Sequence, residues 1–180
     1  MTSIITAALM LCSTGDPVIA EKIAMEAVRQ DTNIVVAVTI GIMESGLGRK
    51  SHDNPMGVRG CYPEAKKKHK RTTDDCIRIG VTSIHNRLWD AYVTSPRERG
   101  CSAAESGNIK NSIPTCVGLS NAVPWSSTMG LGDPHISGVV YRALVVYNGA
   151  NRGRKYVYAK KAMGIIRRIY KIMGTKVPNT

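Results

Sequence analysis

The apolar run from Ile34 to Met43 constrains the fold of this chain more than any other feature. It contains no charged residue and has the length of a short buried helix. Asp31-Thr32-Asn33 stands before it, and residues of this kind favour the N-cap of a helix. The run ends in a single carboxylate, Glu44, followed by Ser45 and Gly46. We therefore predict a buried central helix with one acidic side chain at its C-terminal end.

Two interpretations of Glu44 follow from the residue pattern. In the first, Glu44 is only the polar last turn of a core helix. In the second, it has a chemical role, because desolvation disfavours the charged form of a carboxyl group. A carboxylic acid that keeps its proton beside a Gly-rich loop is what a glycosidase needs to protonate a leaving sugar oxygen. The pattern alone leaves both interpretations open.

The other helices are predicted from N-cap signals and periodicity. The chain has 180 residues, of which 43% are apolar, and this is enough for one domain with its own core. Asp16-Pro17 and Asp133-Pro134 each predict the start of a helix, since Asp is a good N-cap and Pro suits the first helical position. The second of these helices should end at Asn148-Gly149, a turn signal. Further helices are expected over 83–93 and 154–173, the latter amphipathic.

A small sheet is expected between the central helix and residue 83. Met56–Val58 and Cys76–Val81 are short enough for strands, and the alternation of Ile77, Ile79 and Val81 is typical of a half-buried strand. The fold class predicted is therefore mainly α (α+β), a single helical domain with a small antiparallel β-sheet.

The first 13 residues form an apolar segment with two interpretations. Met1–Ser13 resembles the apolar region of a secretory signal, but it lacks a positive N-terminal region and a clear cleavage site. It is too short to span a bilayer. It is either a weak signal-like segment or a first helix packed on the domain formed by 14–180.

The net charge of +12 and the pI of about 9.7 predict attraction to polyanions. Nucleic acid and the anionic envelope of a bacterium are both candidate partners. The strongest charge run is Lys66–Arg71, which is either a solvated loop or the rim of a cleft. A basic nucleic-acid-binding protein that uses this run and the last helix is therefore one alternative function.

Four of the five cysteines form two pairs of identical spacing, Cys61 with Cys76 and Cys101 with Cys116. In an oxidising compartment these pairs would close two local loops, although four cysteines allow three connectivities. Free thiols are the alternative. A zinc site would need closely spaced ligands such as C-x-x-C, which the sequence lacks, so neither a metal nor a cofactor is predicted.

Two separate segments resemble one known family. The apolar helix, Glu44-Ser45-Gly46, the loop and Asn54-Pro-Met-Gly-Val58 look like the catalytic stretch of lysozyme-like lytic transglycosylases of the soluble, phage and goose-lysozyme-like type. A second hallmark of that family, an Ala-Tyr-Asn-x-Gly helix, has a near match at Val146–Gly149. The resemblance covers about half of the chain, over 14–60 and 137–171, and implies a lysozyme-like fold.

The resemblance implies that Glu44 is the general acid and then the general base. It would protonate the glycosidic oxygen between N-acetylmuramic acid and N-acetylglucosamine, then accept the proton of the C6 hydroxyl, which attacks C1 and leaves a 1,6-anhydro ring. No second carboxylate is required. Ser45 would contact the substrate or the loop. Gly57 and Val58 would contact substrate, although the Gln that the family carries in that segment is missing here. Tyr147 would hold the Glu44 carboxyl, and Asn148 would shape the cleft wall.

Flagellar-type glucosaminidases resemble the Glu44–Gly60 segment as well. These enzymes hydrolyse the other glycosidic bond of the same polymer, and Asp74 or Asp75 would then supply a second acid. A muramidase acting on that polymer is a related alternative. A further alternative is a wall-binding protein that retains Glu44 without activity.

Under either enzymatic interpretation the substrate is peptidoglycan. The protein would be a bacteriolytic enzyme, secreted, periplasmic or virion-associated, as in a phage endolysin. It would act as a monomer without a cofactor or an obligatory nucleic acid, in peripheral contact with the anionic cell envelope.

Overall fold

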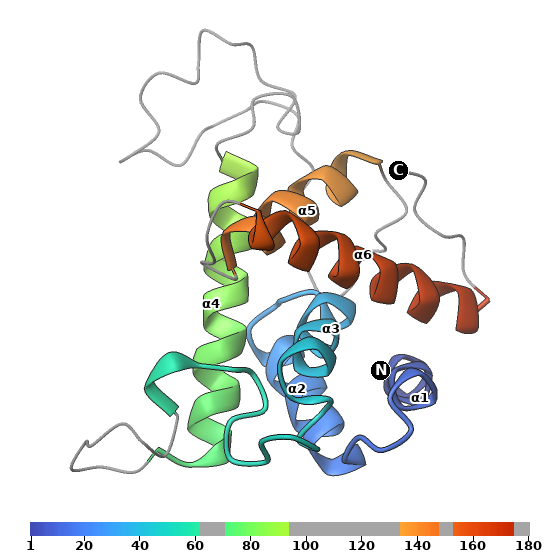
Figure 1. Ribbon diagram of the computed structural model, residues 1–180, viewed down its shortest axis with the longest axis vertical. Helices are drawn as coiled ribbons and strands as arrows, with labels where there is room; N and C mark the ends of the chain where they lie inside the picture. The colour runs from blue at the N-terminus through green and yellow to red at the C-terminus, as the bar shows by residue number, and fades with distance from the viewer. Residues whose placement is uncertain (62–70, 94–133, 148–152, 175–180) are drawn as a thin grey trace, which may run out of the picture.

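The computed structural model describes residues 1–61, 71–93, 134–147 and 153–174 (Figure 1). In Figure 1, α4 runs along the long axis, α5 and α6 lie across its upper half, and α2 and α3 lie beside its lower half, with α1 beyond them on the side away from α4. The elements in these ranges are six α-helices and one short 3-10 helix, with no strand among them: α1 (Thr2–Leu11), α2 (Pro17–Arg29), α3 (Ile34–Ser45), η1 (Arg59–Cys61), α4 (Thr73–Val93), α5 (Pro134–Tyr147) and α6 (Arg154–Ile172).

Helix α3 is the centre of the core, as predicted. All its residues from Ile34 to Gly41 are buried, and it packs against α1, α2 and α6. A helix that is apolar on every side is stable only where other elements cover it all round. The Asn33 side chain accepts a hydrogen bond from the backbone N of Val36 at 3.2 Å, and Gly46 ends the helix in the left-handed conformation with φ of 63°.

The helix starts predicted from Asp-Pro pairs are confirmed. Asp16 caps α2 by accepting from the backbone N of Val18 at 2.8 Å, with Pro17 at the first position. Helix α5 begins at Pro134, directly after Asp133. Helix α6 agrees with the amphipathic segment predicted over 154–173.

Helix α1 is packed on the domain. Ala7 and Ala8 are fully buried, and the helix lies against α2, α3 and α6. Of the two interpretations of the first 13 residues, the structure contains the packed helix. No helix in the described part of the chain is long and apolar enough to cross a membrane.

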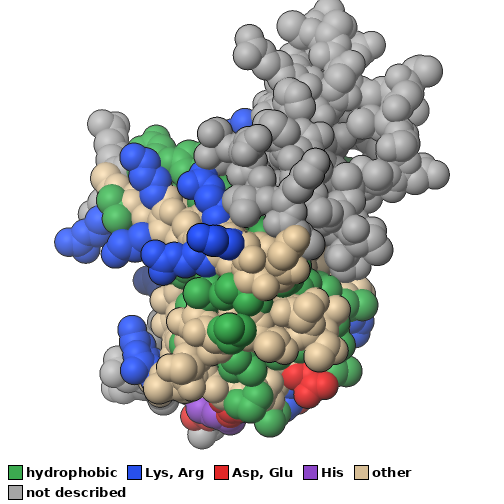
Figure 2. All heavy atoms as spheres, turned by 90° about the vertical axis from the view of Figure 1, so that its right-hand side faces the viewer, with side chains coloured by type: hydrophobic (Ala, Val, Ile, Leu, Met, Phe, Trp, Pro, Cys, Tyr) green, Lys and Arg blue, Asp and Glu red, His purple; other side chains and the backbone are tan. Residues whose placement is uncertain are grey.

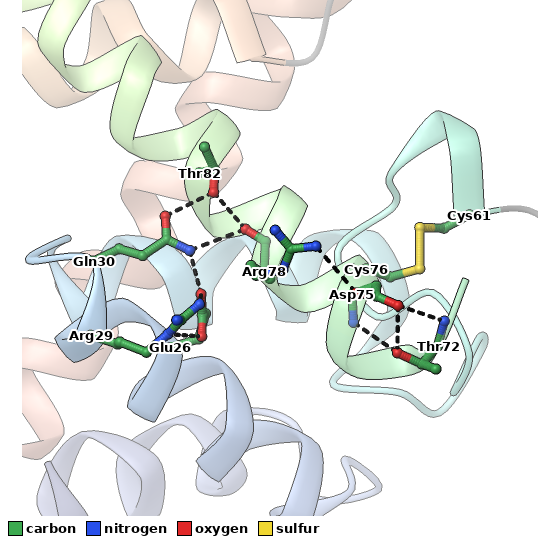
Figure 3. A network of polar contacts seen from close by, with 9 residues as sticks. All are labelled: Glu26, Arg29, Gln30, Cys61, Thr72, Asp75, Cys76, Arg78 and Thr82. Carbon is green, nitrogen blue, oxygen red and sulfur yellow. Dashed lines mark hydrogen bonds and ion pairs between the residues drawn. A yellow bond between two sulfur atoms is a disulfide. The ribbon is translucent and has the colours of Figure 1, made fainter.

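The predicted sheet is wrong for the residues described. Cys76–Val81, expected as a strand, lies inside α4 together with the predicted helix over 83–93. The reason is a reciprocal cap at the start of α4 (Figure 3): Thr72 Oγ1 accepts from the backbone N of Asp75 at 3.1 Å, and Asp75 Oδ2 accepts from the backbone N of Thr72 at 3.2 Å. This is a capping box, with Asp in the place of the usual Glu or Gln.

Side-chain burial along α4 follows a helical period rather than an alternating one. Ile77, Val81, Ile84 and Leu88 are all buried, at intervals of three and four residues. Ile77 and Val81 therefore belong to this helical stripe, whereas Ile79 between them lies off it and is only half-buried. The hydrogen bonds from Thr72 hold the pKa of Asp75 below its ordinary value, so the cap stays charged at neutral pH.

The other predicted strand, Met56–Val58, is a loop. Gly57 has φ of 66°, a left-handed conformation that is incompatible with an extended strand. The segment instead forms a tight turn, in which the backbone N of Gly57 donates to the Asn54 carbonyl oxygen at 3.3 Å.

Polar contacts join the C-terminal end of α2 to α4 (Figure 3). Gln30 Nε2 donates to the Arg78 carbonyl oxygen at 3.2 Å, and Thr82 Oγ1 donates to Gln30 Oε1 at 2.9 Å. Gln30 also donates to Glu26, which is paired with Arg29. The guanidinium of Arg29 lowers the pKa of Glu26, so this cluster keeps its charge pattern at neutral pH.

One of the two expected disulfides is confirmed. Cys61 and Cys76 are bonded, which ties η1 to the first turn of α4. Cys101 and Cys116 lie outside the described residues. The Cys61–Cys76 bond anchors the segment that follows α3, including the loop with Gly57.

We predict that Cys61→Ala/Cys76→Ala lowers the free energy of unfolding by about 3 kcal/mol, because the bond restricts the unfolded chain across a sequence separation of 15. Urea denaturation followed by circular dichroism measures the change. Cys12→Ala is the matched control, since Cys12 is a free thiol. An equal loss of stability in both variants would contradict a specific role for the bond.

Candidate active site

A hydrogen bond between Glu44 and Tyr158 is the centre of the candidate site. Glu44 is half-buried in the last turn of α3, and Tyr158 is half-buried in the second turn of α6. The Tyr158 hydroxyl donates to Glu44 Oε1 at 2.6 Å, between residues 114 positions apart in the chain. This length is typical of a hydroxyl bound to a charged carboxylate.

The Tyr158 hydroxyl is a permanent hydrogen-bond donor in this pair. Burial raises the pKa of its hydroxyl far above the ordinary value, and the negative charge of Glu44 raises it further. The phenol therefore keeps its proton throughout the physiological range. Glu44 Oε1 is thus always offered a hydrogen bond, which fixes the orientation of the carboxyl group.

The second carboxylate oxygen of Glu44 lies against Gly57. A Cβ atom at Gly57 would lie 2.9 Å from Glu44 Cδ and would overlap Oε2. The backbone of Gly57 also has a φ of 66°, which side-chain-bearing residues adopt at a cost. Glycine is therefore favoured at this position for two separate reasons. The turn needs a left-handed backbone, and the carboxyl group leaves no room for a Cβ atom.

The loop that carries Gly57 is held on both sides. The buried side chain of Asn54 accepts from the backbone N of Val58 at 2.8 Å and donates to the Val58 carbonyl oxygen at 3.0 Å. Met56 is fully buried and lies so close to Gly80 of α4 that a Cβ there would clash with the Met56 side chain. The hydroxyl of Tyr147, from α5, donates to the Met56 carbonyl oxygen at 3.1 Å.

Ser45, expected at the substrate or the loop, contacts the loop. Its hydroxyl donates to the Gly41 carbonyl oxygen at 3.2 Å and accepts from the backbone N of Gly48 at 2.7 Å. It is fully buried. Ser45 therefore stabilises the turn after α3. This turn fixes the C-terminal end of the helix that carries Glu44.

The structure brings together Glu44, Gly57, Val58 and Tyr147, all of which were predicted as site residues. The hydrogen bond that the resemblance assigned to Tyr147 is made by Tyr158, while Tyr147 supports the loop through Met56. The two tyrosines are close enough for Tyr147 to affect the pKa of Tyr158. Asn148 lies outside the described residues.

The two candidates for a second acid are engaged elsewhere. Asp74 is exposed and forms an ion pair with Lys22 of α2 at 2.7 Å. Asp75 belongs to the cap of α4 and to an ion pair with Arg78. Both carboxylates therefore have contacts that stabilise α4.

Two residues of the site were missed from sequence. Tyr158 lies on the apolar side of the amphipathic segment over 154–173, and a buried tyrosine hydroxyl needs a polar partner. The sequence therefore shows that Tyr158 needs a partner, but not that the partner is Glu44. Asn54 precedes Pro55, a combination that favours a turn, and its side chain is suited to binding nearby backbone groups.

The chemistry available is that of one oriented carboxyl group, which can donate and accept a proton. Among the described residues, no group of three or more His, Cys, Asp or Glu side chains is placed to hold a metal ion. The helix end, the two tyrosines and the glycine together define the position of the Glu44 carboxyl.

We predict a steric coupling between Gly57 and Glu44 in a double-mutant cycle. Gly57→Ala should cost about 1–2 kcal/mol of unfolding free energy from the left-handed backbone and more from the clash with the carboxyl group. In a Glu44→Ala background the clash is gone, so only the backbone cost should remain. Urea denaturation of the four proteins measures the coupling.

Gly174→Ala is the matched control, because Gly174 has φ of 68° but no atom within 4 Å of a built Cβ. It should lose only the backbone cost and show no dependence on Glu44. A Gly57→Ala cost that is the same with and without the Glu44 side chain would refute the contact.

No protein-family model, curated protein or solved structure matches this chain. The function is therefore inferred from the geometry around Glu44 and from the sequence resemblance described above.

Proposed function

We propose that the protein is a lysozyme-like glycosidase that cleaves the glycan strands of peptidoglycan, with the chemistry of a lytic transglycosylase. Glu44 is its general acid and then its general base. The observation that carries the proposal is the Glu44 carboxyl at the end of a buried apolar helix, oriented by the Tyr158 hydroxyl at 2.6 Å and lying against Gly57. A carboxyl group fixed in this way is suited to proton transfer.

The two oxygens of Glu44 have different environments, which suggests different roles. Oε1 accepts the hydrogen bond from Tyr158, whose proton does not leave at physiological pH. Oε2, beside Gly57, is then the atom that carries the transferred proton. It passes this proton to the glycosidic oxygen between N-acetylmuramic acid and N-acetylglucosamine. It next accepts the proton of the C6 hydroxyl as that oxygen bonds to C1.

The contacts of Asp74 and Asp75 favour the single-acid mechanism over hydrolysis by a carboxylate pair. A hydrolase of the glucosaminidase type needs a second carboxyl group beside the scissile bond. Asp74 is paired with Lys22, and Asp75 is part of the α4 cap. In the transglycosylase mechanism the N-acetyl group of the substrate stabilises the positive charge, and the C6 hydroxyl replaces water.

The Cys61–Cys76 disulfide supports an extracytoplasmic site of action. Disulfides form and persist in oxidising compartments and are rare in the cytosol. Peptidoglycan lies in such compartments. The proposed enzyme acts there as a monomer, on a polymer that its net charge of +12 attracts.

We predict that Glu44→Gln lowers the rate of peptidoglycan digestion by about 10²–10⁴-fold, because an amide cannot transfer the proton. Release of soluble fragments from purified cell walls measures the rate. Asp74→Asn and Asp75→Asn are the controls, and both should retain most of the activity. Mass analysis of the fragments should show 1,6-anhydro ends.

Other results of the same experiment point to other functions. Free reducing ends, together with a large loss in either Asp variant, would assign a hydrolase with two acids. Wild-type protein that binds walls but releases nothing would be a wall-binding protein, and the proposed activity would be rejected.

We predict that Tyr158→Phe lowers the digestion rate by about tenfold to a hundredfold, the range expected when a hydrogen bond to a charged group is lost. The fold should be kept, because the ring remains. Tyr156→Phe is the matched control on the same helix, since Tyr156 is 48% exposed. Equal activity in the two variants would exclude Tyr158 from positioning Glu44.

A further inference from the structure

Helix α6 has a strongly basic composition. It has no acidic residue, so its charged side chains are all positive, and it also has no Ser, Thr, Asn or Gln. This charge is denser than in any other described helix. The basic residues are Arg154, Lys155, Lys160, Lys161, Arg167, Arg168 and Lys171.

The charges lie on the side of α6 that faces away from the core. The inner side is buried through Ala159, Ala162, Ile166 and Ile169. In Figure 2, Lys and Arg side chains gather over α6 in the upper part of the described surface, with no acidic side chain among them. We call this surface the basic face and define it by its five exposed members: Arg154, Lys160, Lys161, Arg168 and Lys171.

The basic face is long. At a rise of 1.5 Å per residue, its first and last members are about 25 Å apart along the helix axis. Lys160 and Lys161 lie two turns from Arg168 along the helix, and Lys171 follows within one further turn. A surface of this kind attracts an extended array of negative charges rather than one small anion.

Exposed apolar side chains accompany these charges. Tyr156, Val157 and Ile172 of α6 are 48%, 53% and 38% exposed. Helix α1, which has no charged side chain, packs beside α6 (Figure 1), and its Met10 is 66% exposed. The basic face is therefore interrupted by apolar residues, and an uncharged helix packs against the same helix α6.

This combination fits an anionic lipid surface better than a nucleic acid. Helices that lie on membranes carry Lys and Arg with neighbouring apolar side chains that enter the headgroup region. Nucleic-acid contacts commonly add Ser, Thr, Asn, Gln or Tyr donors to phosphate and bases, and of these α6 has only tyrosines. We propose that the basic face of α6, together with the adjoining uncharged helix α1, docks the protein on a bilayer that contains anionic lipids.

This inference goes beyond the proposed function and does not depend on it. Tyr158 is directed from α6 toward Glu44, whereas the members of the basic face are exposed to solvent. Docking on lipid therefore requires no peptidoglycan. Glu44→Gln should bind vesicles as tightly as the wild-type protein, whatever its effect on wall digestion.

The experiment measures cosedimentation of the full chain with vesicles of phosphatidylcholine alone and with 30% phosphatidylglycerol. Wild-type protein should bind only the anionic vesicles. Lys160→Gln/Lys161→Gln/Lys171→Gln should lower the partition coefficient about a hundredfold, because each lysine near such a surface contributes about a fivefold gain.

The matched control removes three positive charges elsewhere. Lys50→Gln/Arg59→Gln/Arg71→Gln changes exposed residues outside α6 and should lower the partition coefficient much less. Circular dichroism establishes that both triple variants are folded. Binding should also weaken as salt is raised, since exposed charges are screened.

Three outcomes would overturn the proposal. The first is no binding of wild-type protein to anionic vesicles. The second is an equal loss in the two triple variants, which would mean that net charge alone attracts the protein. The third is tighter binding to duplex DNA than to vesicles, lost in the α6 variant, which would assign the basic face to nucleic acid.

Discussion

The hydrogen bond from Tyr158 to Glu44 joins the central helix of the core, α3, to helix α6. Helix α3 is buried on all sides and ends in the one acid of its sequence, while α6 covers it and supplies the phenol. A half-buried carboxylate is costly unless hydrogen bonds replace its lost water. The tyrosine meets that need. The hydrogen bond from Tyr158 therefore both offsets the cost of burying the Glu44 carboxylate and orients it.

The loop after α3 lies against the second carboxylate oxygen of Glu44, through Gly57. It is fixed by Asn54 within the loop, by packing of Met56 on α4, by the Tyr147 hydroxyl from α5 and by the Cys61–Cys76 bond. Contacts from α4 and α5, two helices that follow later in the chain, thus fix the loop that lies against the Glu44 carboxyl group. Such convergence is expected of a site whose geometry matters, because a shift of about 1 Å is enough to impair proton transfer.

Local signals predicted the helices well and the segment after α3 poorly. The Asp16-Pro17 cap, the apolar run of α3 and the amphipathic period of α6 are each readable within one segment. The start of α4 was misassigned because Ile77, Ile79 and Val81 alternate as in a strand, while the helical spacing is seen only when Ile77 and Val81 are taken together with Ile84 and Leu88. The cap formed by Thr72 and Asp75 decides between them, and it was overlooked.

The site itself was predictable only in part. Glu44 could be identified because an acid that follows a long apolar run is conspicuous within one segment. Its partner could not, since Tyr147 and Tyr158 both follow helical patterns and only the packing of α5 and α6 shows which hydroxyl reaches the carboxyl. The contact of Gly57 with Glu44 likewise depends on the path of the loop. Side-chain partners across 114 residues are set by tertiary packing, and no local pattern encodes them.

The order of synthesis gives the position of Tyr158 a further consequence. Ribosomes make the chain from its N-terminus, so Glu44 emerges long before α6 exists. Until that last helix docks, the carboxyl lacks its phenol and α3 lacks its cover. A nascent or truncated chain would thus contain the acid in an open, unoriented state. Assembly of the reactive geometry is delayed until the final helix of the described fold is in place.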